Sequence, residues 1–322
     1  MKQISLKEIA GFSIGHDENI QAATGCTVIL CESGATAGVD VRGGAPGTRE
    51  TDLLQSGNLV DAVHGVFLSG GSAYGLDVGS GIMKFLEERQ IGFDVQVAKV
   101  PIVTGAVLFD LAIGSSEIRP DYLMGYRAAQ HAQLVNQFVE GNIGAGTGAT
   151  VGKCLGPDHA MKGGLGIYAV QVGDLKIGAI VAVNCFGDVI DPTSNEIIAG
   201  VYDYQLEQYL NSEKQLLNQI ENESNTNRFQ GNTAIGTIIT NAKLTKSQAN
   251  KVASMAHDGF ARTMRPSHTM VDGDTIFAMS CGDVEADLNI VGMLAASVIE
   301  TAVINGVKKA QTLDAVIGYA SM

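Results

Sequence analysis

A polar segment changes abruptly into an apolar one at Gly231-Asn232-Thr233, within the stretch FQGNTAIGTIITNA. If the bond between Asn232 and Thr233 were cut, Thr233 would carry both a β-hydroxyl and a free α-amine. An α-amine has an ordinary pKa of about 7.7–8.0, so part of it is unprotonated at neutral pH and accepts the hydroxyl proton. One residue then supplies both the nucleophile and the general base.

The cut itself can be autocatalytic. The Thr233 hydroxyl attacks the carbonyl carbon of Asn232, an N-to-O acyl shift gives an ester, and water releases the ester. The shift needs a strained, kinked bond, and Gly231 and Asn232 are residue types that tolerate unusual backbone angles. The alternative is an ordinary loop that enters a strand. Composition alone favours that alternative.

A glycine-rich segment, GNIGAGTGATVGK, is the second candidate for chemistry and runs from Gly141 to Lys153. A dinucleotide site needs G-x-G-x-x-G after a convincing strand, which is missing here. A Walker A loop needs Ser or Thr after the lysine, but Cys154 follows Lys153. A glycine loop that packs against another backbone or lines a pocket is the favoured interpretation.

The histidines and cysteines show no metal-ligand spacing. There is no HExxH, no CxxC and no G-x-S-x-G elbow. Most of the histidines are expected to be structural or solvent-facing. No metal and no organic cofactor is therefore predicted. The five scattered cysteines fit free thiols in a reducing compartment, and the N-terminus MKQISLKEIA has no apolar signal core, so a cytoplasmic setting is expected.

Composition narrows the classes of partner. The 322 residues are 45% hydrophobic and carry a formal net charge of -13, without a run of Lys or Arg. Binding to nucleic acid normally requires a basic patch, so no nucleic-acid partner is expected. The most apolar stretch, Val291 to Val307, is interrupted by Glu300 and Asn305. It is predicted to be a core helix, and no membrane partner is expected.

The elements that must position these residues alternate between strands and helices. Strands are predicted at Thr27–Cys31, Ala37–Val41, Ala234–Thr240, Ile276–Cys281 and 313–320, with a hairpin of Leu165–Val172 and Leu175–Val183. Helices are predicted at Tyr74–Arg89, Ser194–Glu221, Thr245–Met264 and Asp283–Val307. A polar, aperiodic linker, ENESNTNRFQGN, precedes Thr233. Strands that come in hairpins beside helices favour a layered α+β sandwich over a purely parallel sheet.

Several motifs together resemble one known family. They are GNTAIGTIITNA, RPSHTMVDGDTIFAMS, GAGTGATVGK followed by KGGLG, GVDVRGGAPGTRETDLL, VHGVFLSGGSAYGLD and VPIVTGAVLFDL. In this order, over nearly the whole chain, they are similar to the DmpA/BapA family of L-aminopeptidase/D-esterases and β-peptidyl aminopeptidases. Any one of these motifs alone would be weak, whereas their common order is strong.

The resemblance implies an αββα four-layer sandwich like that of the N-terminal-nucleophile hydrolases. It implies a single peptidase domain over residues 1–322, which cleaves itself between Asn232 and Thr233 into an α chain, 1–232, and a β chain, 233–322. It also implies that αβ units assemble as a homotetramer, and that small peptides, amides or esters are the substrates.

The resemblance assigns roles to individual residues. Thr233 is the expected nucleophile, and Asn184 matches an asparagine whose neutral amide helps form the oxyanion hole. Asp272 and Asp274 match a Ser-x-acid pair that orients the nucleophile, so Asp272 departs from the better-described members. Tyr74 lies in a motif near the substrate pocket. From the residues alone, Asn184 is equally an asparagine that closes a strand in a turn. The Asp-Gly-Asp is more often a turn or a weak cation loop, and the alternative for Tyr74 is a core tyrosine.

The predicted function is that of a self-processing aminopeptidase or amidase-esterase, which acts through an acyl ester on Thr233. Two alternatives stay open at this point. One is an acyltransferase of the ornithine acetyltransferase type, whose Met-Ala-Thr-Met-Leu-like site QGNTAIG does not match. The other is an uncleaved, non-catalytic homologue that binds small molecules.

Overall fold

A computed structural model describes residues 1–221 and 231–322 of the chain. The helices are α1 Val78–Glu87, α2 Tyr122–Leu134, α3 Ser212–Glu221, α4 Lys246–Thr263 and α5 Leu288–Lys308. The strands are β1 Lys2–Gln3, β2 Ser13–Asn19, β3 Thr24–Val41, β4 Gly47–Arg49, β5 Val63–Ser69, β6 Phe93–Asp94, β7 Lys99–Val100, β8 Val103–Val107, β9 Thr150–Val151, β10 Met161–Lys162, β11 Gly164–Val172, β12 Leu175–Val183, β13 Asp188–Ile190, β14 Ile197–Ala199, β15 Tyr202–Asp203, β16 Gln208–Tyr209, β17 Ile235–Ala242, β18 Met264–Arg265 and β19 Thr275–Val284.

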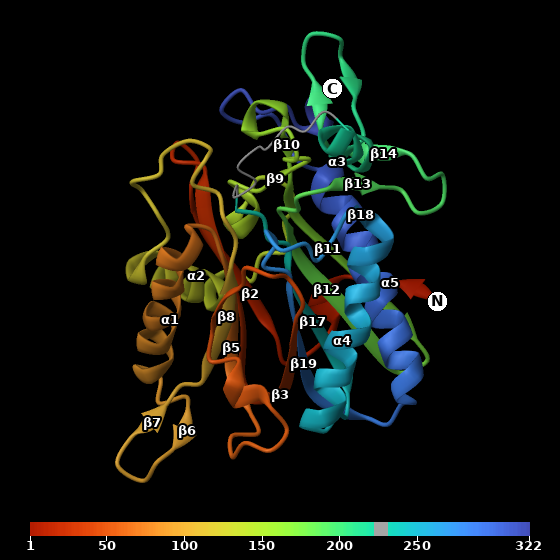
Figure 1. The fold of residues 1–322 in the computed structure, drawn as a ribbon. Helices are drawn as coiled ribbons and strands as arrows, with labels where there is room; N and C mark the ends of the chain where they lie inside the picture. Colours follow the sequence, from red (N-terminus) through yellow and green to blue (C-terminus); the bar gives the residue numbers. More distant parts are fainter. Residues whose placement is uncertain (222–230) are drawn as a thin grey trace.

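Two sheets lie between two pairs of helices. The strands run β1-β11-β12-β17-β19-β3-β5-β8-β4, with β2 on β3. The second half of β3 pairs with β19 and the first half with β2 and β5, so β3 belongs to both sheets. Figure 1 shows α4 and α5 on one outer side and α1 and α2 on the other, with the strands between them. This is the predicted α+β four-layer sandwich.

The alternation of side chains along each strand builds three apolar interfaces. In β17, Ile238 packs toward α4 and α5, whereas Ile239 packs between the two sheets. In β3, Val28 and Leu30 pack toward α1 and α2, whereas Ile29 packs between the sheets. Successive residues of a strand point to opposite faces, so strands that are apolar on both faces form the two inner layers.

The predicted hairpin is confirmed as β11 and β12, whose register runs from Gly164 opposite Val183 to Val172 opposite Leu175. The two short strands predicted at Thr27–Cys31 and Ala37–Val41 are parts of the single strand β3. The helix predicted from Tyr74 is a 3-10 turn, Ser72–Asp77, followed by α1. The predicted polar linker lies, for residues 222–230, outside the described residues.

The helix predicted over Ser194–Glu221 is wrong for most of its length. Strands β14, β15 and β16 come first, and only the last ten residues form α3. Asn195, Glu207 and Asn211 have left-handed φ angles of 62°, 51° and 64°, which a right-handed helix does not accommodate. The Asp191 carboxylate accepts the Thr193 amide at 2.9 Å and closes a turn there instead of capping a helix.

The strand predicted over 313–320 is also wrong. Leu313 and Val316 form an isolated bridge, and a 3-10 turn, Tyr319–Ser321, ends the chain. Asp314 and Ala315 have positive φ angles of 49° and 65°, so the chain reverses direction at that point.

Among the described residues, α5 has the length and apolar composition that a membrane span also has. Most of its apolar side chains pack in the core beside α4 and the sheet that contains β12 and β17. The core-helix prediction for Val291 to Val307 agrees with this packing.

His16, on β2, lies buried in a network of contacts that its neutral form satisfies. Its Nδ1 lies 3.0 Å from Thr27 Oγ1 and its Nε2 lies 3.3 Å from the carbonyl oxygen of Gln137. Thr27 Oγ1 also accepts the Ala145 amide at 3.1 Å, and the Thr27 hydroxyl can donate to Nδ1 of neutral His16. Burial lowers the pKa of His16 to about 4.

Stability is therefore expected to fall as the pH is lowered from about 6.5 to about 4. In this window the unfolded state binds a proton at His16 and the folded state does not, so unfolding becomes easier. The loss from His16 is about 2 kcal/mol at about pH 5. Urea unfolding measured across the window checks it. The His16→Gln variant should show a shallower pH slope, and equal slopes for the two proteins would contradict the assignment.

Candidate functional site

Most of the predicted site residues come together at one end of the neighbouring strands β12, β17 and β19. The parallel strands β17 and β19 begin there, just after Thr233 and Asp274, and the antiparallel strand β12 ends there, just before Asn184. Because Ala182 of β12 pairs with Ile235 of β17, Asn184 and Thr233, which lie two residues beyond this pair, come close together. The main chain of Asn232 also bridges in parallel to Asp272.

The backbone at the junction is held in a conformation that suits glycine alone. Gly231 has φ +41°, and a Cβ atom at this position would lie 2.1 Å from Phe109 Cγ. Such a contact excludes a side chain, and the positive φ angle disfavours one independently. The chain therefore turns sharply against the Phe109 ring immediately before Asn232 and Thr233, which are both buried.

Three polar contacts surround the peptide bond between Asn232 and Thr233. The Thr233 hydroxyl lies against the carbonyl oxygen of Asn232. The Gly273 amide donates to the same oxygen at 2.9 Å, and the Thr233 amide donates to the carbonyl oxygen of Asn184 at 2.8 Å. A hydroxyl of the kind that can act as a nucleophile, a donor on the carbonyl oxygen and an acceptor for the amide nitrogen thus converge on one peptide bond.

The Asn184 side chain is held in one orientation. Its Oδ1 accepts the Thr150 amide at 2.9 Å and the Lys153 ammonium at 2.9 Å. These donors fix which side of the amide is oxygen. Nδ2 then faces the other way and donates one hydrogen to the carbonyl oxygen of Phe109 at 3.1 Å.

Lys153 is fully buried and bridges this part of the site. Besides Oδ1, its Nζ contacts the carbonyl oxygen of Asn184 at 3.2 Å, the same oxygen that accepts the Thr233 amide. Burial lowers the pKa of Lys153 to about 8, although the nearby carboxylates Asp272 and Asp274 act in the opposite direction.

The two aspartates lie behind the junction, and both are buried. Asp272 accepts the Phe186 amide at 3.2 Å and the Thr269 amide at 3.0 Å. Burial, together with the charge of Asp274, raises the pKa of Asp272 to about 6. Asp274 Oδ1 accepts the Ala234 amide at 2.8 Å, so this carboxylate holds the peptide that follows Thr233.

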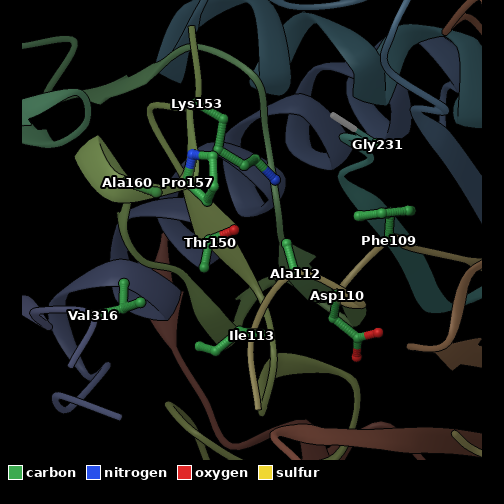
Figure 2. A pocket seen from close by; sticks show the side chains of 10 residues that line it. All are labelled: Phe109, Asp110, Ala112, Ile113, Thr150, Lys153, Pro157, Ala160, Gly231 and Val316. Carbon is green, nitrogen blue, oxygen red and sulfur yellow. The ribbon is translucent and has the colours of Figure 1, made fainter. Parts of the chain in front are cut away.

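A cavity of about 300 Å³ adjoins the junction. Its lining is Phe109, Asp110, Ala112, Ile113, Thr150, Lys153, Pro157, Ala160, Gly231 and Val316. Figure 2 shows the Lys153 side chain extending across the cavity toward the side where Gly231 and Phe109 lie. The lining is mostly apolar and contains the Lys153 amine and the residue next to Asn232, as expected of a site for a small ligand.

Of the predicted site residues, Asn184, Asn232, Thr233, Asp272 and Asp274 lie together, and Tyr74 does not line this cavity. Tyr74 lies exposed in the turn before α1, beneath the Arg119 guanidinium, which is 3.9 Å from its ring centre. The role of Tyr74 in binding substrate stays a prediction.

Sequence reasoning missed Lys153 and Gly273. Lys153 ends the glycine-rich segment, where it was weighed only as part of a nucleotide loop. A 3-10 turn, Pro157–His159, follows that segment in place of the α-helix of a nucleotide loop. The glycines of the segment pack against other backbone, since a Cβ on Gly146 would lie 2.1 Å from the Leu165 amide nitrogen. Gly273 packs against Thr233, because a Cβ there would lie 2.7 Å from Thr233 Oγ1.

Among residues 1–221 and 231–322, no group of three His, Cys, Asp or Glu side chains is arranged to hold a metal ion. A reaction without metal or organic cofactor stays a prediction.

Comparison of the sequence with known families and proteins gives a consistent result. The sequence profile of peptidase family S58 matches residues 5–320. An uncharacterized aminopeptidase of Mycobacterium leprae is 40% identical over 299 residues, 88% of this chain and 80% of the relative. A 6-aminohexanoate-oligomer endohydrolase of Agromyces sp. (strain KY5R) is 32% identical over 282 residues, 86% of this chain and 75% of the relative.

Solved structures share the fold. The L-aminopeptidase D-Ala-esterase/amidase of Ochrobactrum anthropi, described as a variant of the Ntn hydrolase fold, aligns with TM-score 0.69 at 18% identity, over 96% of this chain and 87% of its own. A β-aminopeptidase of Burkholderia sp. aligns with TM-score 0.68 at 16% identity, over 98% of this chain and 90% of its own. At these identities the likeness shows the fold.

Proposed function

This chain belongs to peptidase family S58 and is a hydrolase of the aminopeptidase kind; from that premise we propose that it cleaves itself between Asn232 and Thr233. The mature enzyme then releases N-terminal residues from small peptides, amides or esters through an acyl ester on Thr233. One observation carries the proposal: the Thr233 hydroxyl lies against the carbonyl of Asn232, whose oxygen also accepts the Gly273 amide.

Self-cleavage begins with attack of Thr233 Oγ1 on the carbonyl carbon of Asn232. Negative charge develops on the oxygen that the Gly273 amide already contacts, and a preorganised donor lowers the barrier. The bond from that carbon to the Thr233 nitrogen breaks, and the nitrogen takes up the proton that the hydroxyl has lost and becomes the α-amine. Water hydrolyses the resulting ester, which frees the Asn232 carboxylate and restores the Thr233 hydroxyl.

The mature reaction repeats this chemistry on a substrate. The α-amine of Thr233 accepts the hydroxyl proton, Oγ1 bonds to the substrate carbonyl carbon, and the leaving amine or alcohol takes the proton. The second hydrogen of Asn184 Nδ2 is available to the oxyanion, since one hydrogen goes to Phe109. Water then attacks the acyl ester on Thr233 and releases the acid product.

The decisive measurement is the intact mass of the purified protein, followed by a substrate panel. Two fragments that separate after Asn232 and hydrolysis of amino-acid p-nitroanilides, small esters or 6-aminohexanoate oligomers are the expected results. An ornithine assay with an acyl donor separates the acyltransferase alternative. A single inactive chain of 33.6 kDa, unchanged on long incubation, would sink the proposal.

Lys153 is expected to act as a positioning residue, since it contacts Asn184 through both Oδ1 and the main-chain oxygen. The Lys153→Met variant keeps the length of the side chain and removes these hydrogen bonds. We expect kcat to fall about tenfold with KM changed by less than about twofold, because the amide loses its fixed orientation. Steady-state kinetics on a p-nitroanilide substrate measure kcat and KM separately.

The matched control is Lys162→Met. Lys162 is a second fully buried lysine, but its ammonium contacts the carbonyl oxygens of Thr147 and Ala149 and not Asn184. Both variants should lose stability, and only Lys153→Met should lose kcat. Equal kcat values in the two variants would show that Lys153 contributes to stability and does not position Asn184 for hydrolysis.

We also infer a homotetramer of αβ units and a cytoplasmic setting. The family resemblance supports the first inference. Five free cysteines, four of them buried, support the second, because unpaired thiols persist in reducing compartments. Size-exclusion chromatography with light scattering, before and after self-cleavage, tests the assembly.

A further inference from the structure

A chain of polar contacts runs from Ala234, the residue after Thr233, through Asp274 to His268, and none of these residues lines the cavity described above. Asp274 Oδ1 accepts the Ala234 amide at 2.8 Å. Asp274 Oδ2 accepts two donors from His268, the main-chain amide at 3.0 Å and ring Nδ1 at 2.8 Å. A carboxylate only accepts, so His268 Nδ1 carries a hydrogen. One oxygen of Asp274 therefore holds the backbone next to Thr233 and the other is held by His268.

A second histidine lies against the first. The ring centres of His257, on α4, and His268 are 4.8 Å apart, with an interplanar angle of 74°. His257 Nε2 lies 2.9 Å from the carbonyl oxygen of Asp40 and donates to it. In neutral His257 the remaining nitrogen, Nδ1, is then an acceptor.

Each of the two rings keeps one buried nitrogen without a hydrogen-bond partner among the described residues, namely Nδ1 of His257 and Nε2 of His268. Buried polar atoms without partners are uncommon, and two on adjacent rings call for a common explanation. The two open nitrogens are not hydrogen-bonded to each other in this arrangement, although their rings are neighbours. Burial lowers the pKa of His257 to about 4, so His257 stays a neutral acceptor in the range where histidines ordinarily titrate.

Charged groups lie close to both His257 and His268. On the side of His268, Asp274 is in contact and Asp272 lies behind it, close enough that the charge of Asp274 raises the pKa of Asp272. On the side of His257, the Asp40 carboxylate and the Arg42 guanidinium pair with each other at 2.9 Å. Lys153 lies close enough to Asp272 and Asp274 for their charges to act on it, and the charged group in direct contact with His268 is Asp274.

The backbone of His268 is also unusual, with φ +57°. Histidine adopts this left-handed region more readily than most residues, but still at a cost. That conformation aims both the amide and Nδ1 of His268 at the same oxygen of Asp274. A structural role alone accounts for one bond to a buried carboxylate, but not for the paired open nitrogens.

We propose that His268 is a positioning residue for hydrolysis, which holds Asp274 against the Ala234 amide, and that protonation of His268 at Nε2, with His257 as acceptor, turns this contact into an ion pair. The inference rests on the proposed function, because it concerns the carboxylate beside Thr233. The positive charge balances Asp274, which otherwise stabilises the protonated α-ammonium of Thr233. The amine of Thr233 then stays available as a base at lower pH.

The first experiment compares the pH profiles of kcat/KM for the wild-type protein and His268→Asn. Asparagine suits the left-handed backbone and keeps an N–H near Asp274, but it gains no charge. We expect rates within about threefold of wild type at about pH 8.5 and a deficit of about tenfold at about pH 6, because histidine at position 268 changes charge in this range and asparagine does not. Parallel profiles would overturn the proposal.

The matched control is His131→Asn. His131 is another part-buried histidine whose Nδ1 contacts a carbonyl oxygen, that of His16 at 2.7 Å, on α2 at the far side of the sandwich. Its profile should follow that of the wild type in shape.

The second experiment does not depend on activity. In the Thr233→Ala chain, which has no nucleophile, histidine ring signals are followed by NMR against pH, with His268 identified by the signal that His268→Asn removes. Adding Asp274→Asn should lower the midpoint of the His268 titration by about one pH unit or more. An unchanged midpoint would refute the ion pair. If the wild-type chain neither cleaves nor hydrolyses, the proposed function fails and this titration alone decides the inference.

Discussion

The Thr233→Ala chain is expected to remain a single species of 33.6 kDa and to lose hydrolysis altogether. The only atom that lies against the carbonyl of Asn232 as a nucleophile is the hydroxyl of this residue, among the residues that the structure describes. Without it neither the acyl shift nor the later acyl ester forms. A loss of about 10⁴-fold or more in kcat is the scale seen when a nucleophile is removed. Intact mass and p-nitroanilide turnover measure the two effects.

Two further variants sharpen this result. Thr233→Ser keeps the hydroxyl and should keep both reactions, with a less restricted χ1 angle. Thr237→Ala removes another buried hydroxyl, from β17, the strand that follows Thr233. The Oγ1 atom of Thr237 has no partner in the described structure. This variant should cleave itself normally. Cleavage or turnover in Thr233→Ala comparable to wild type would remove the basis of the mechanism.

The Asn184→Asp chain is expected to cleave itself and yet hydrolyse substrate about 10²- to 10³-fold more slowly. The substitution keeps the shape of the side chain and the acceptor for Thr150 and Lys153, but it replaces the Nδ2 donor by an oxygen. The donor on the carbonyl oxygen of Asn232 is the Gly273 amide, which the substitution leaves in place. Intramolecular and intermolecular reactions therefore respond differently.

The measurement is kcat on a p-nitroanilide beside a mass time course of cleavage. Asn305→Asp is the matched control, because Asn305 also donates Nδ2 to a carbonyl oxygen, that of Ile167 at 2.9 Å, but it does so on α5. A kcat for Asn184→Asp within about threefold of the control would exclude an oxyanion role. Failure of self-cleavage in Asn184→Asp would show that Gly273 is not sufficient for that step.

The elements that the sequence predicted well are those with a strong apolar period. The hairpin of β11 and β12 and the helices α4 and α5 follow from patterns that tertiary contacts only reinforce. The failures lie at 194–221 and 313–320. There, polar residues such as Asn195, Asn211 and Asp314 adopt left-handed angles, and composition does not specify which asparagine turns the chain.

By itself, the sequence determined the layered fold class, the candidate junction at Asn232 and Thr233, and the membership of a peptidase family through ordered motifs. These depend on local residue types and on spacing along the chain. Only the tertiary structure decided that the carbonyl of Asn184 meets the Thr233 amide, that Lys153 orients Asn184, and that His268 holds Asp274. The physical reason is that these contacts join strand ends and loops that are far apart along the chain or whose sequences have no hydrophobic periodicity. The register of β12, β17 and β19 brings them together at one end of these strands.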